Sequence, residues 1–368
     1  MMKRDMYHTK PFFLRARTLI PALLLLLLGA ACTDPADELT ADDGRTATLR
    51  LLVPRPDATT RVDPTEDYEN SLEAEERAIH TLRIVVYSLS DGNNATTVNR
   101  LYTKEELAKA DTDEKGNAVL TIEGIPTGTA QICAIANEAS IGRDYSDILD
   151  MQKEAVTVGQ NSKVLIVDTM KYFPKRGTQL LEEADTDPKG LPMSWMEKNC
   201  NIQESGNTLD VELERCVAKI RMEVHNNFSE NITVKEISFG KFFGNSFYLF
   251  RDTSLDVPSD QTYVSQTFTE DVAYTIDPGR SEVLILYFYP SFAWTSSTQG
   301  SPYTVGYKTA LGNYPAMAFL GGSGSSFNSI PRNKQVNIDV TLSGDTNVQT
   351  SFDVVDWTDV TINVPDFN

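Results

Sequence analysis

The sequence predicts a mainly β protein built from antiparallel β-sandwich domains. Most segments after residue 77 are short apolar or alternating runs separated by Gly, Pro, Asn and Asp, as in sandwiches of short strands. Only two short segments, at Lys104–Ala110 and near Arg143–Lys153, have a helical pattern. The chain has 368 residues, of which 40% are hydrophobic, so it is long and apolar enough for two domains.

The N-terminus has the layout of an export signal. Basic residues precede an apolar run at Leu19–Leu28, and small residues follow at 29–31. A permanent transmembrane helix needs about 20 apolar residues, and this run is too short. Because Cys32 comes directly after the small residues, we expect a lipoprotein signal, with the Cys32 thiol acylated and the chain cut before it. The alternative is an ordinary signal peptide with an incidental cysteine, since Gly29 stands where leucine is usual.

The first predicted strand follows a polar tether that ends at Arg45. An apolar residue stands at every second position, which is typical of a strand with one buried face. These apolar residues are Ala47, Leu49, Leu51 and Val53. The next residues, 54–77, contain three prolines, many acidic residues and few apolar ones, so we expect a long exposed loop.

Further strands are predicted along the rest of the chain. In order, they lie in IHTLRIVVYSLSDGN, NAVLTIEGIPTG, AQICAIANE, KVLIVDTM, NTLDVELERCVAKIRMEV, ITVKEISF, SEVLILYFYP, KQVNIDVTL, TSFDVVDW and DVTINVPDF. The longest of these, NTLDVELERCVAKIRMEV, is expected to pass from one sandwich to the next, with a domain boundary near Arg215.

The charge of the chain makes nucleic acid a poor partner. Lysine and arginine number 33 against 52 aspartates and glutamates, and the formal net charge is −19. So acidic a protein repels phosphate backbones.

No pattern of catalytic or metal-ligating residues stands out. The 3 histidines are scattered, and His8 would leave with the signal. The segments DTDEKG (111–116) and DTDPKG (185–190) begin like calcium loops. Each has lysine at the fifth position and neither has glutamate at the twelfth, so we expect turns. GGSGSS (321–326) lacks the Lys-Ser/Thr of a phosphate-binding loop. The sequence therefore predicts no enzyme, no cofactor and no metal site.

The cysteines beyond Cys32 do not indicate a disulfide framework, because no CxxC spacing occurs. Cys133 lies in an apolar run, and we expect it to be buried in a strand. Cys200 and Cys216 could pair after export, but we favour the alternative in which they stay unpaired.

Five stretches of the chain share a likeness to one known family. The first two are TATLRLLVPRPDATTRVDP and EAEERAIHTLRIVVYS. LPMSWMEK, followed by LDVELERCVAKIRMEV, is the third, and IPRNKQVNIDVTL and SFDVVDWTDVTINV are the last two. In this order they resemble the fimbrillins, the type V pilus subunits of Bacteroidales-type bacteria, over the chain from Cys32 to the C-terminus. Trp195 departs from the family pattern, in which glycine is commoner and a turn is expected.

The resemblance implies two transthyretin-like β-sandwich domains and assembly by strand exchange. Subunits of this family travel as lipoproteins to the outer surface, where an Arg-specific protease cuts the loop after the first strand. The first strand then leaves, and the terminal strand of a partner fills its groove. We therefore expect an outer-membrane precursor held by its lipid, and then an extracellular fimbrium that supports adhesion. The implied partners are other copies of the chain, other fimbrial subunits and the protease.

The resemblance and the strand patterns together place the expected sites. Arg61 is the expected cleavage site, because Pro56 follows Arg55 and a cut after Arg45 would leave the groove filled. The removable strand holds the four alternating apolar residues named above. The donor strand would present Phe352, Val354, Trp357, Val360, Ile362 and Val364. The expected segments are the signal at 1–31, a propeptide at 32–61, sandwich domains at 62–215 and 216–349, and a donor tail at 350–368.

Other functions remain open from the sequence. The chain could be a fimbrial anchor subunit that keeps its lipid and its first strand, and each terminal segment could be a plain edge strand of its own domain. A tip adhesin is less favoured, because a tip needs no free donor tail. From a different class, a surface glycan-binding lipoprotein is the alternative. Its sugar platform would be Trp294, Tyr303, Tyr307 and Tyr314.

Overall fold

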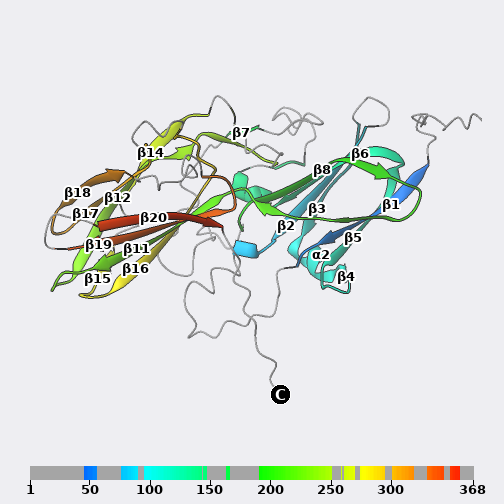
Figure 1. Cartoon of the computed structure of the whole chain (residues 1–368). Coiled ribbons are helices and arrows are strands. Elements are labelled where there is room, and N and C mark those ends of the chain that lie inside the picture. The colour runs from blue at the N-terminus through cyan, green and yellow to red at the C-terminus, as the bar shows by residue number, and fades with distance from the viewer. Residues whose placement is uncertain are drawn as a thin grey trace, which may run out of the picture. The chain divides into compact units, whose positions relative to one another are not determined.

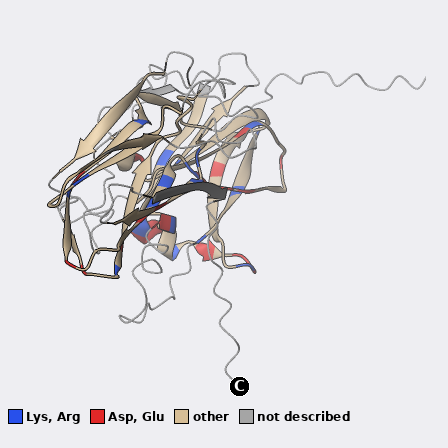
Figure 2. Ribbon diagram, turned by 60° about the vertical axis from the view of Figure 1, so that its left-hand side comes forward, with Lys and Arg blue, Asp and Glu red and all other residues tan. Residues whose placement is uncertain are grey.

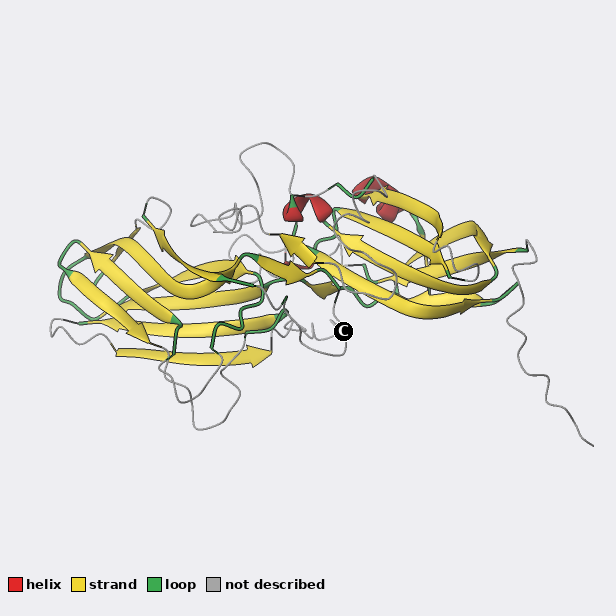
Figure 3. Ribbon diagram, turned by 90° about the horizontal axis from the view of Figure 1, so that it is seen from above, coloured by secondary structure: helices red, strands yellow, loops and turns green. Residues whose placement is uncertain are grey.

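The protein is mainly β, and the predicted fold class is confirmed (Figure 1). In the computed structural model, the described residues are 45–55, 76–89, 95–142, 144–146, 163–165, 190–250, 258, 261–269, 274–294, 301–318, 330–343 and 349–356. Within these residues, strands dominate and helices are short, as Figure 3 shows. Most strand pairs are antiparallel, and the pairs β1–β9 and β11–β19 are parallel.

The strands up to residue 215 form the first sandwich. One of its sheets has the order β4-β5-β1-β9 and the other has the order β10-β8-β6-β2-β3. The strands are β1 (Thr46–Val53), β2 (Thr81–Ser88), β3 (Ala95–Thr103), β4 (Asp111–Thr112), β5 (Ala118–Pro126), β6 (Gly128–Ala136), β8 (Met193–Ile202), β9 (Asn207–Asp210) and β10 (Glu214–Arg215).

The strands from residue 218 onward form the second sandwich. Its sheets have the orders β16-β11-β19-β20 and β14-β12-β17-β18, and β15 also pairs with β12. The strands are β11 (Ala218–Asn226), β12 (Ile232–Gly244), β14 (Tyr263–Phe268), β15 (Tyr274–Ile276), β16 (Ser281–Phe288), β17 (Thr304–Thr309), β18 (Asn313–Ala318), β19 (Lys334–Leu342) and β20 (Gln349–Asp356). A separate two-stranded sheet joins β7 (Lys163–Leu165) to β13 (Ser246–Tyr248).

Each sandwich encloses an apolar core supplied by both of its sheets. In the first sandwich, Leu51 of β1 and Ile84 of β2 belong to one buried cluster. In the second, Phe239 of β12 packs edge-on against Phe242, with ring centroids 5.7 Å apart, and the same cluster contains Ile338 of β19. Alternation along strands with one buried face puts these side chains inside.

A third buried cluster contains side chains of both sandwiches. Tyr87 of β2 and Cys133 of β6 belong to it, together with Phe247 of β13 and Tyr287 of β16. The rings of Phe247 and Tyr289 stack within it, with centroids 4.1 Å apart.

The helix predicted near residue 104 is present as α2 (Lys104–Lys109). Its start is fixed by a capping box, in which the Thr103 hydroxyl accepts from the backbone N–H of Glu106 and the Glu106 carboxylate accepts from the backbone N–H of Thr103. A short 3₁₀ helix, η1, spans Glu138–Ile141. The second predicted helix, near Arg143–Lys153, falls largely outside the described residues.

The structure corrects three expectations from the sequence. NTLDVELERCVAKIRMEV is not one strand but three, β9, β10 and β11, because residues 216 and 217 form a bend between β10 and β11. Glu76, expected in an exposed loop, is buried at 1% exposure. Trp195 lies within strand β8 rather than in a turn, and it packs against the first core.

Candidate functional site

Strand β1 lies in the interior of its sheet and not at an edge. It pairs antiparallel with β5, where Leu51 faces Leu120, and parallel with β9, where Leu51 faces Leu209. The sheet order β4-β5-β1-β9 places both neighbours beside it. If β1 left, two strands would therefore lose the backbone partner that it provides.

The apolar face of β1 is fully inside the first core. Leu49 and Leu51 have no exposed area, and Ala47 and Val53 are 5% and 2% exposed. The predicted half-buried strand is thus confirmed. Burying a valine or leucine side chain contributes about 1.5–3 kcal/mol each, so the three larger side chains hold β1 by about 5–9 kcal/mol as an upper estimate.

Strand β9 depends on β1 for its place in the sheet. It is the edge strand of its sheet and pairs there with β1 alone among the described strands. The Asn207 amide donates to the Thr48 carbonyl, and the Val211 N–H donates to the Leu52 carbonyl at 2.9 Å. Removal of β1 would leave these backbone groups exposed along a groove between β5 and β9, and such an open edge favours the addition of another strand.

The two ends of β1 are held differently. At its start, the Arg45 carbonyl accepts from the Thr127 N–H at 3.0 Å, and the exposed Arg45 side chain pairs with Glu204. At its end, Arg55 Nη2 donates to the carbonyls of Leu107 at 2.9 Å and Ala110 at 2.6 Å. Both arginines that flank β1 therefore contact other parts of the first sandwich, Arg45 through Glu204 and Arg55 through the end of α2.

Two expected sites lie outside the described residues. Cys32 belongs to the residues before 45, and Arg61 to residues 56–75, so the structure places neither the lipidation site nor the cleavage site. No described helix is long and apolar enough to cross a membrane.

The structure places the first part of the expected donor tail within its own sandwich. Phe352 and Val354 lie in β20, which pairs antiparallel with β19, opposite Ile338 and Val336. This differs from a tail that is unpaired before assembly, because residues 349–356 already complete a sheet edge. Trp357, Val360, Ile362 and Val364 are outside the described residues.

A buried ion pair joins Glu76, five residues before the start of β2, to the second sandwich. The Glu76 carboxylate lies 2.7 Å from the Lys219 ammonium and accepts from the Tyr287 hydroxyl at 2.6 Å. The Arg215 guanidinium donates to the Glu76 backbone carbonyl at 3.1 Å and to Asn333 Oδ1 at 3.1 Å. Sequence reasoning missed this site, because a glutamate in an acidic stretch gives no local signal of a partner far along the chain.

Residues from three of the stretches used for the family resemblance meet in space. The buried Arg332 guanidinium donates to the Leu249 carbonyl at 2.9 Å and to the Ser194 hydroxyl at 3.3 Å. The Cys216 thiol lies 3.5 Å from the same hydroxyl, and burial raises the pKa of that thiol. These residues come from LPMSWMEK, LDVELERCVAKIRMEV and IPRNKQVNIDVTL. Their common role is to join β8, the bend before β11 and the segment before β19.

The cysteine predictions can be compared with the structure directly. Cys133 is buried in β6, as expected, and burial raises the pKa of its thiol to about 12. Cys200 and Cys216 are both free, so the structure has the unpaired alternative.

One group of side chains has the composition of a metal site. Ligand atoms of Glu223, His225 and Asp339 lie within 4.8 Å of one another. Glu223 already accepts from the Ser281 hydroxyl at 2.7 Å and pairs with Arg221 at 3.2 Å. The Ser281 hydrogen bond is the main cause that lowers the pKa of this carboxyl. Since the arginine supplies a positive charge there, we propose no metal at this position.

The segment DTDEKG forms a turn, as predicted. The Asp113 carboxylate accepts from the backbone N–H groups of Lys115 at 2.9 Å and Asn117 at 2.8 Å. Desolvation by itself would raise the pKa of this carboxyl, but the hydrogen bonds from the Asn117 side chain and from these backbone N–H groups lower it. The carboxylate is thus engaged within its own turn. Of DTDPKG, only Gly190 is described.

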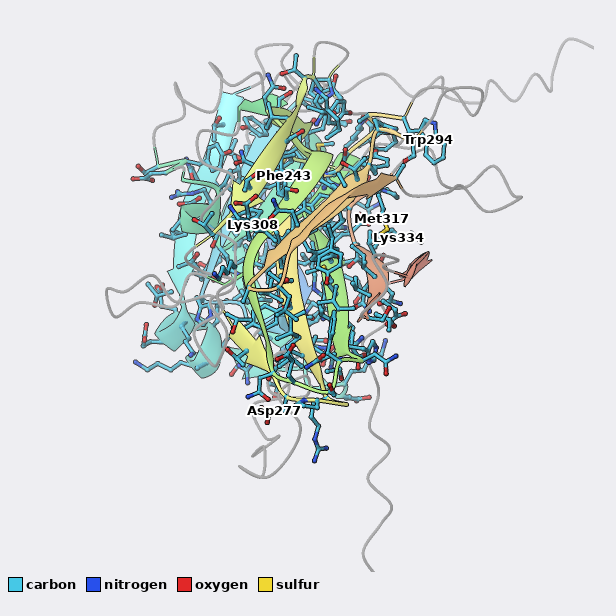
Figure 4. The ribbon with its side chains drawn as sticks, turned by 90° about the vertical axis from the view of Figure 1, so that its left-hand side faces the viewer. Phe243, Asp277, Trp294, Lys308, Met317 and Lys334 are labelled. Atoms are coloured by element: carbon cyan, nitrogen blue, oxygen red, sulfur yellow. The ribbon has the colours of Figure 1, made fainter. Side chains whose placement is uncertain are left out.

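The aromatic residues considered as a sugar platform are core residues instead. Tyr303 and Tyr307 are 0% and 3% exposed, and Trp294 is 7% exposed. Figure 4 shows this sandwich with its side chains and labels Trp294. Tyr314 is partly buried against the same core. Buried faces cannot stack on a sugar, so these aromatics give no support to a glycan-binding function.

Charged residues occur on several of the described strands. In Figure 2 the blue lysine and arginine segments and the red aspartate and glutamate segments are scattered over several strands. One ion pair is both buried and bidentate: Arg83 Nε and Nη2 each lie 2.6 Å from a carboxylate oxygen of Glu138. Such bidentate pairs fix local geometry.

Comparison with known proteins gives one family match. Residues 47–234, just over half of the chain, match the family described as major fimbrial subunit protein (FimA). No curated protein sequence matches the chain.

Solved structures that match the chain include two bacterial fimbrial proteins. The tip fimbrial protein Mfa3 from Porphyromonas gingivalis, with a C-terminal truncation, is 13% identical, with a TM-score of 0.47, over 85% of this chain and 99% of that chain. A fimbrial assembly protein from Parabacteroides distasonis ATCC 8503 is 11% identical, with a TM-score of 0.48, over 84% of this chain and 97% of that chain.

Proposed function

Because the chain belongs to the FimA family of major fimbrial subunit proteins, we propose that it is a stalk subunit that polymerises by strand exchange. As a fimbrial subunit it is a structural protein of the cell surface, assembles with other fimbrial subunits and is not an enzyme. The finer proposal is that Cys32 is acylated, that an Arg-specific protease cuts after Arg61, and that β1 then leaves. A partner's C-terminal tail takes its place.

The observation that supports this most is the position of β1. It is the first described strand, it lies between β5 and β9, and its apolar face is buried in the first core. A strand in that position can leave only if a chain of similar pattern replaces it, because the core and two strand edges would otherwise face water. Val360, Ile362 and Val364 have the required alternation.

The position of β20 refines the proposed donor. Since residues 349–356 pair with β19, we propose that the tail donates its residues after 356 while β20 stays in its own sheet. The division into a propeptide at 32–61, domains at 62–215 and 216–349 and a donor tail is part of this proposal, with the donor now beginning after β20.

Two truncations test the donor. Deletion of residues 357–368 leaves β20 and should give a folded subunit that accepts a neighbour's tail but cannot donate its own. Deletion of 349–368 also removes β20, and it should additionally weaken the second sandwich. Purified, protease-treated subunits are mixed, and polymers are sought on a denaturing gel without boiling. If subunits without 357–368 still form long polymers by themselves, the donor lies elsewhere. If β1 stays bound after protease treatment and the full-length subunits form no polymers, the chain acts as an anchor instead.

A further inference from the structure

We propose that Arg55 clamps the end of the first strand to helix α2 and so controls how fast that strand leaves after the loop is cut. This inference rests on the proposed function, in which β1 departs. It assigns to Arg55 a positioning role that is separate from the cut itself, because Arg55 lies upstream of Arg61 and departs with the strand.

The geometry of Arg55 is that of a cation at a helix C-terminus. Its Nη2 group lies 2.6 Å from the Ala110 carbonyl oxygen and 2.9 Å from that of Leu107, and it approaches the Ala108 carbonyl at 3.5 Å. The last carbonyls of a helix lack the usual helical partners, and the helix dipole makes this end negative. Here the Leu107 carbonyl accepts from the N–H of the C-cap residue Ala110 at 3.4 Å, and Arg55 is a second, charged donor to it. Hydrogen bonds from a charged donor are the stronger ones.

The element that Arg55 binds stays with the body of the subunit. Helix α2 lies between β3 and β4, and its residue Leu107 is buried in the first core. Arg55 is two residues past Val53, the last residue of β1. The guanidinium thus connects the departing segment to an element that does not depart.

The Arg55 contact lies at the end of β1 from which the strand would separate, so it breaks early in that separation. A cut after Arg61 creates a free end on the C-terminal side of β1, and peeling from that end reaches Arg55 before Val53. At the other end of β1, the Arg45–Glu204 pair is exposed, with side-chain exposures of 64% and 62%. Exposed pairs of this kind hold weakly. The Arg55 contact is therefore the stronger of the two side-chain attachments.

Substitution of Arg55 in the full precursor tests the clamp. Arg55→Met keeps much of the side-chain length but removes the charge and the donors, whereas Arg55→Lys keeps one cation without the guanidinium. Arg50→Met is the matched control, because Arg50 is an exposed arginine of the same strand. The precursors are cut with an Arg-specific protease, and the departure of the N-terminal fragment is followed by native mass spectrometry.

The clamp predicts that Arg55→Met releases the fragment about 10–100-fold faster than wild type, since each tenfold corresponds to about 1.36 kcal/mol and two charge-assisted bonds are lost. Arg55→Lys should lie between, and Arg50→Met should match wild type. Equal release rates for Arg55→Met and Arg50→Met would overturn the inference.

If no fragment leaves even the wild-type protein, that result contradicts the proposed function and not the role of Arg55. A second measurement then tests the role of Arg55 by itself. In the uncut precursor, Arg55→Met should raise hydrogen exchange at Leu52–Val53 and at the end of α2, and Arg50→Met should not. Unchanged exchange at both places would show that Arg55 clamps nothing.

Discussion

Replacement of Leu51 by alanine should destabilise the precursor but not the matured subunit. Leu51 has no exposed area and lies in the first core opposite Leu120. Buried leucine-to-alanine changes cost about 2–5 kcal/mol, from lost burial and from the cavity left behind. If β1 leaves during maturation, that cost leaves with it, because a subunit that begins after Arg61 no longer contains residue 51.

The matched control is Leu120→Ala on β5. It alters the same contact from the other side, and at 4% exposure Leu120 is also buried in the first core. Since β5 stays with the body, this variant should be destabilised by a similar amount both before and after maturation.

Native-state hydrogen exchange of the β2 and β5 amides measures both effects by segment. A loss of 2 kcal/mol corresponds to roughly 30-fold faster exchange through global opening, at about 1.4 kcal/mol per tenfold. Leu51→Ala should show at least this change in the precursor and none in assembled, matured subunits. An equal change in both states would mean that β1 is still in its groove after maturation, and the reasoning would be refuted.

Three further predictions follow from the proposed pathway and the buried contacts. Cys32→Ala should abolish fatty-acid labelling and leave the precursor on the periplasmic side of export, and labelling at the wild-type level would contradict a lipoprotein signal. Arg61→Ala should hold the subunit as a lipid-bound monomer with β1 in place, whereas mature protein that begins at Thr46 or Pro56 would show that another arginine is cut. Glu76→Ala should lower the free energy of unfolding in urea by about 3–5 kcal/mol, because it deprives the buried Lys219 ammonium of its carboxylate. Glu75→Ala, one residue upstream, serves as the control. A loss below about 1 kcal/mol would show that the pair behaves as a surface pair.

The strand pattern could be predicted because a strand with one buried face has an apolar residue at every second position. Residues 47–53 have this alternation, and the structure places their apolar face in the core. Helix α2 could be predicted from its local sequence, since Thr103 and Glu106 form the capping box within four residues. In each case the determining contacts are local or periodic.

The remainder depends on contacts between residues far apart in the chain. Nothing near Arg55 shows that it meets α2, and nothing near Glu76 shows that it meets Lys219 and Tyr287. The division of NTLDVELERCVAKIRMEV into three strands likewise follows from different partners, with β9 on β1, β10 on β8 and β11 between β16 and β19. Aromatic residues gave an ambiguous signal, because a tyrosine in a strand has the same spacing whether it faces solvent or core.

The N-terminal sequence of subunits in surface fibres tests the central claim, that the first strand is removed to open the groove for a partner. Fibres sheared from cells are dissociated, and the subunit is sequenced from its N-terminus. The account predicts a sequence that starts at Val62, Val-Asp-Pro-Thr, without the segment Thr46–Val53. Fibre subunits that start at Cys32 or Thr46, and so retain β1, would contradict it.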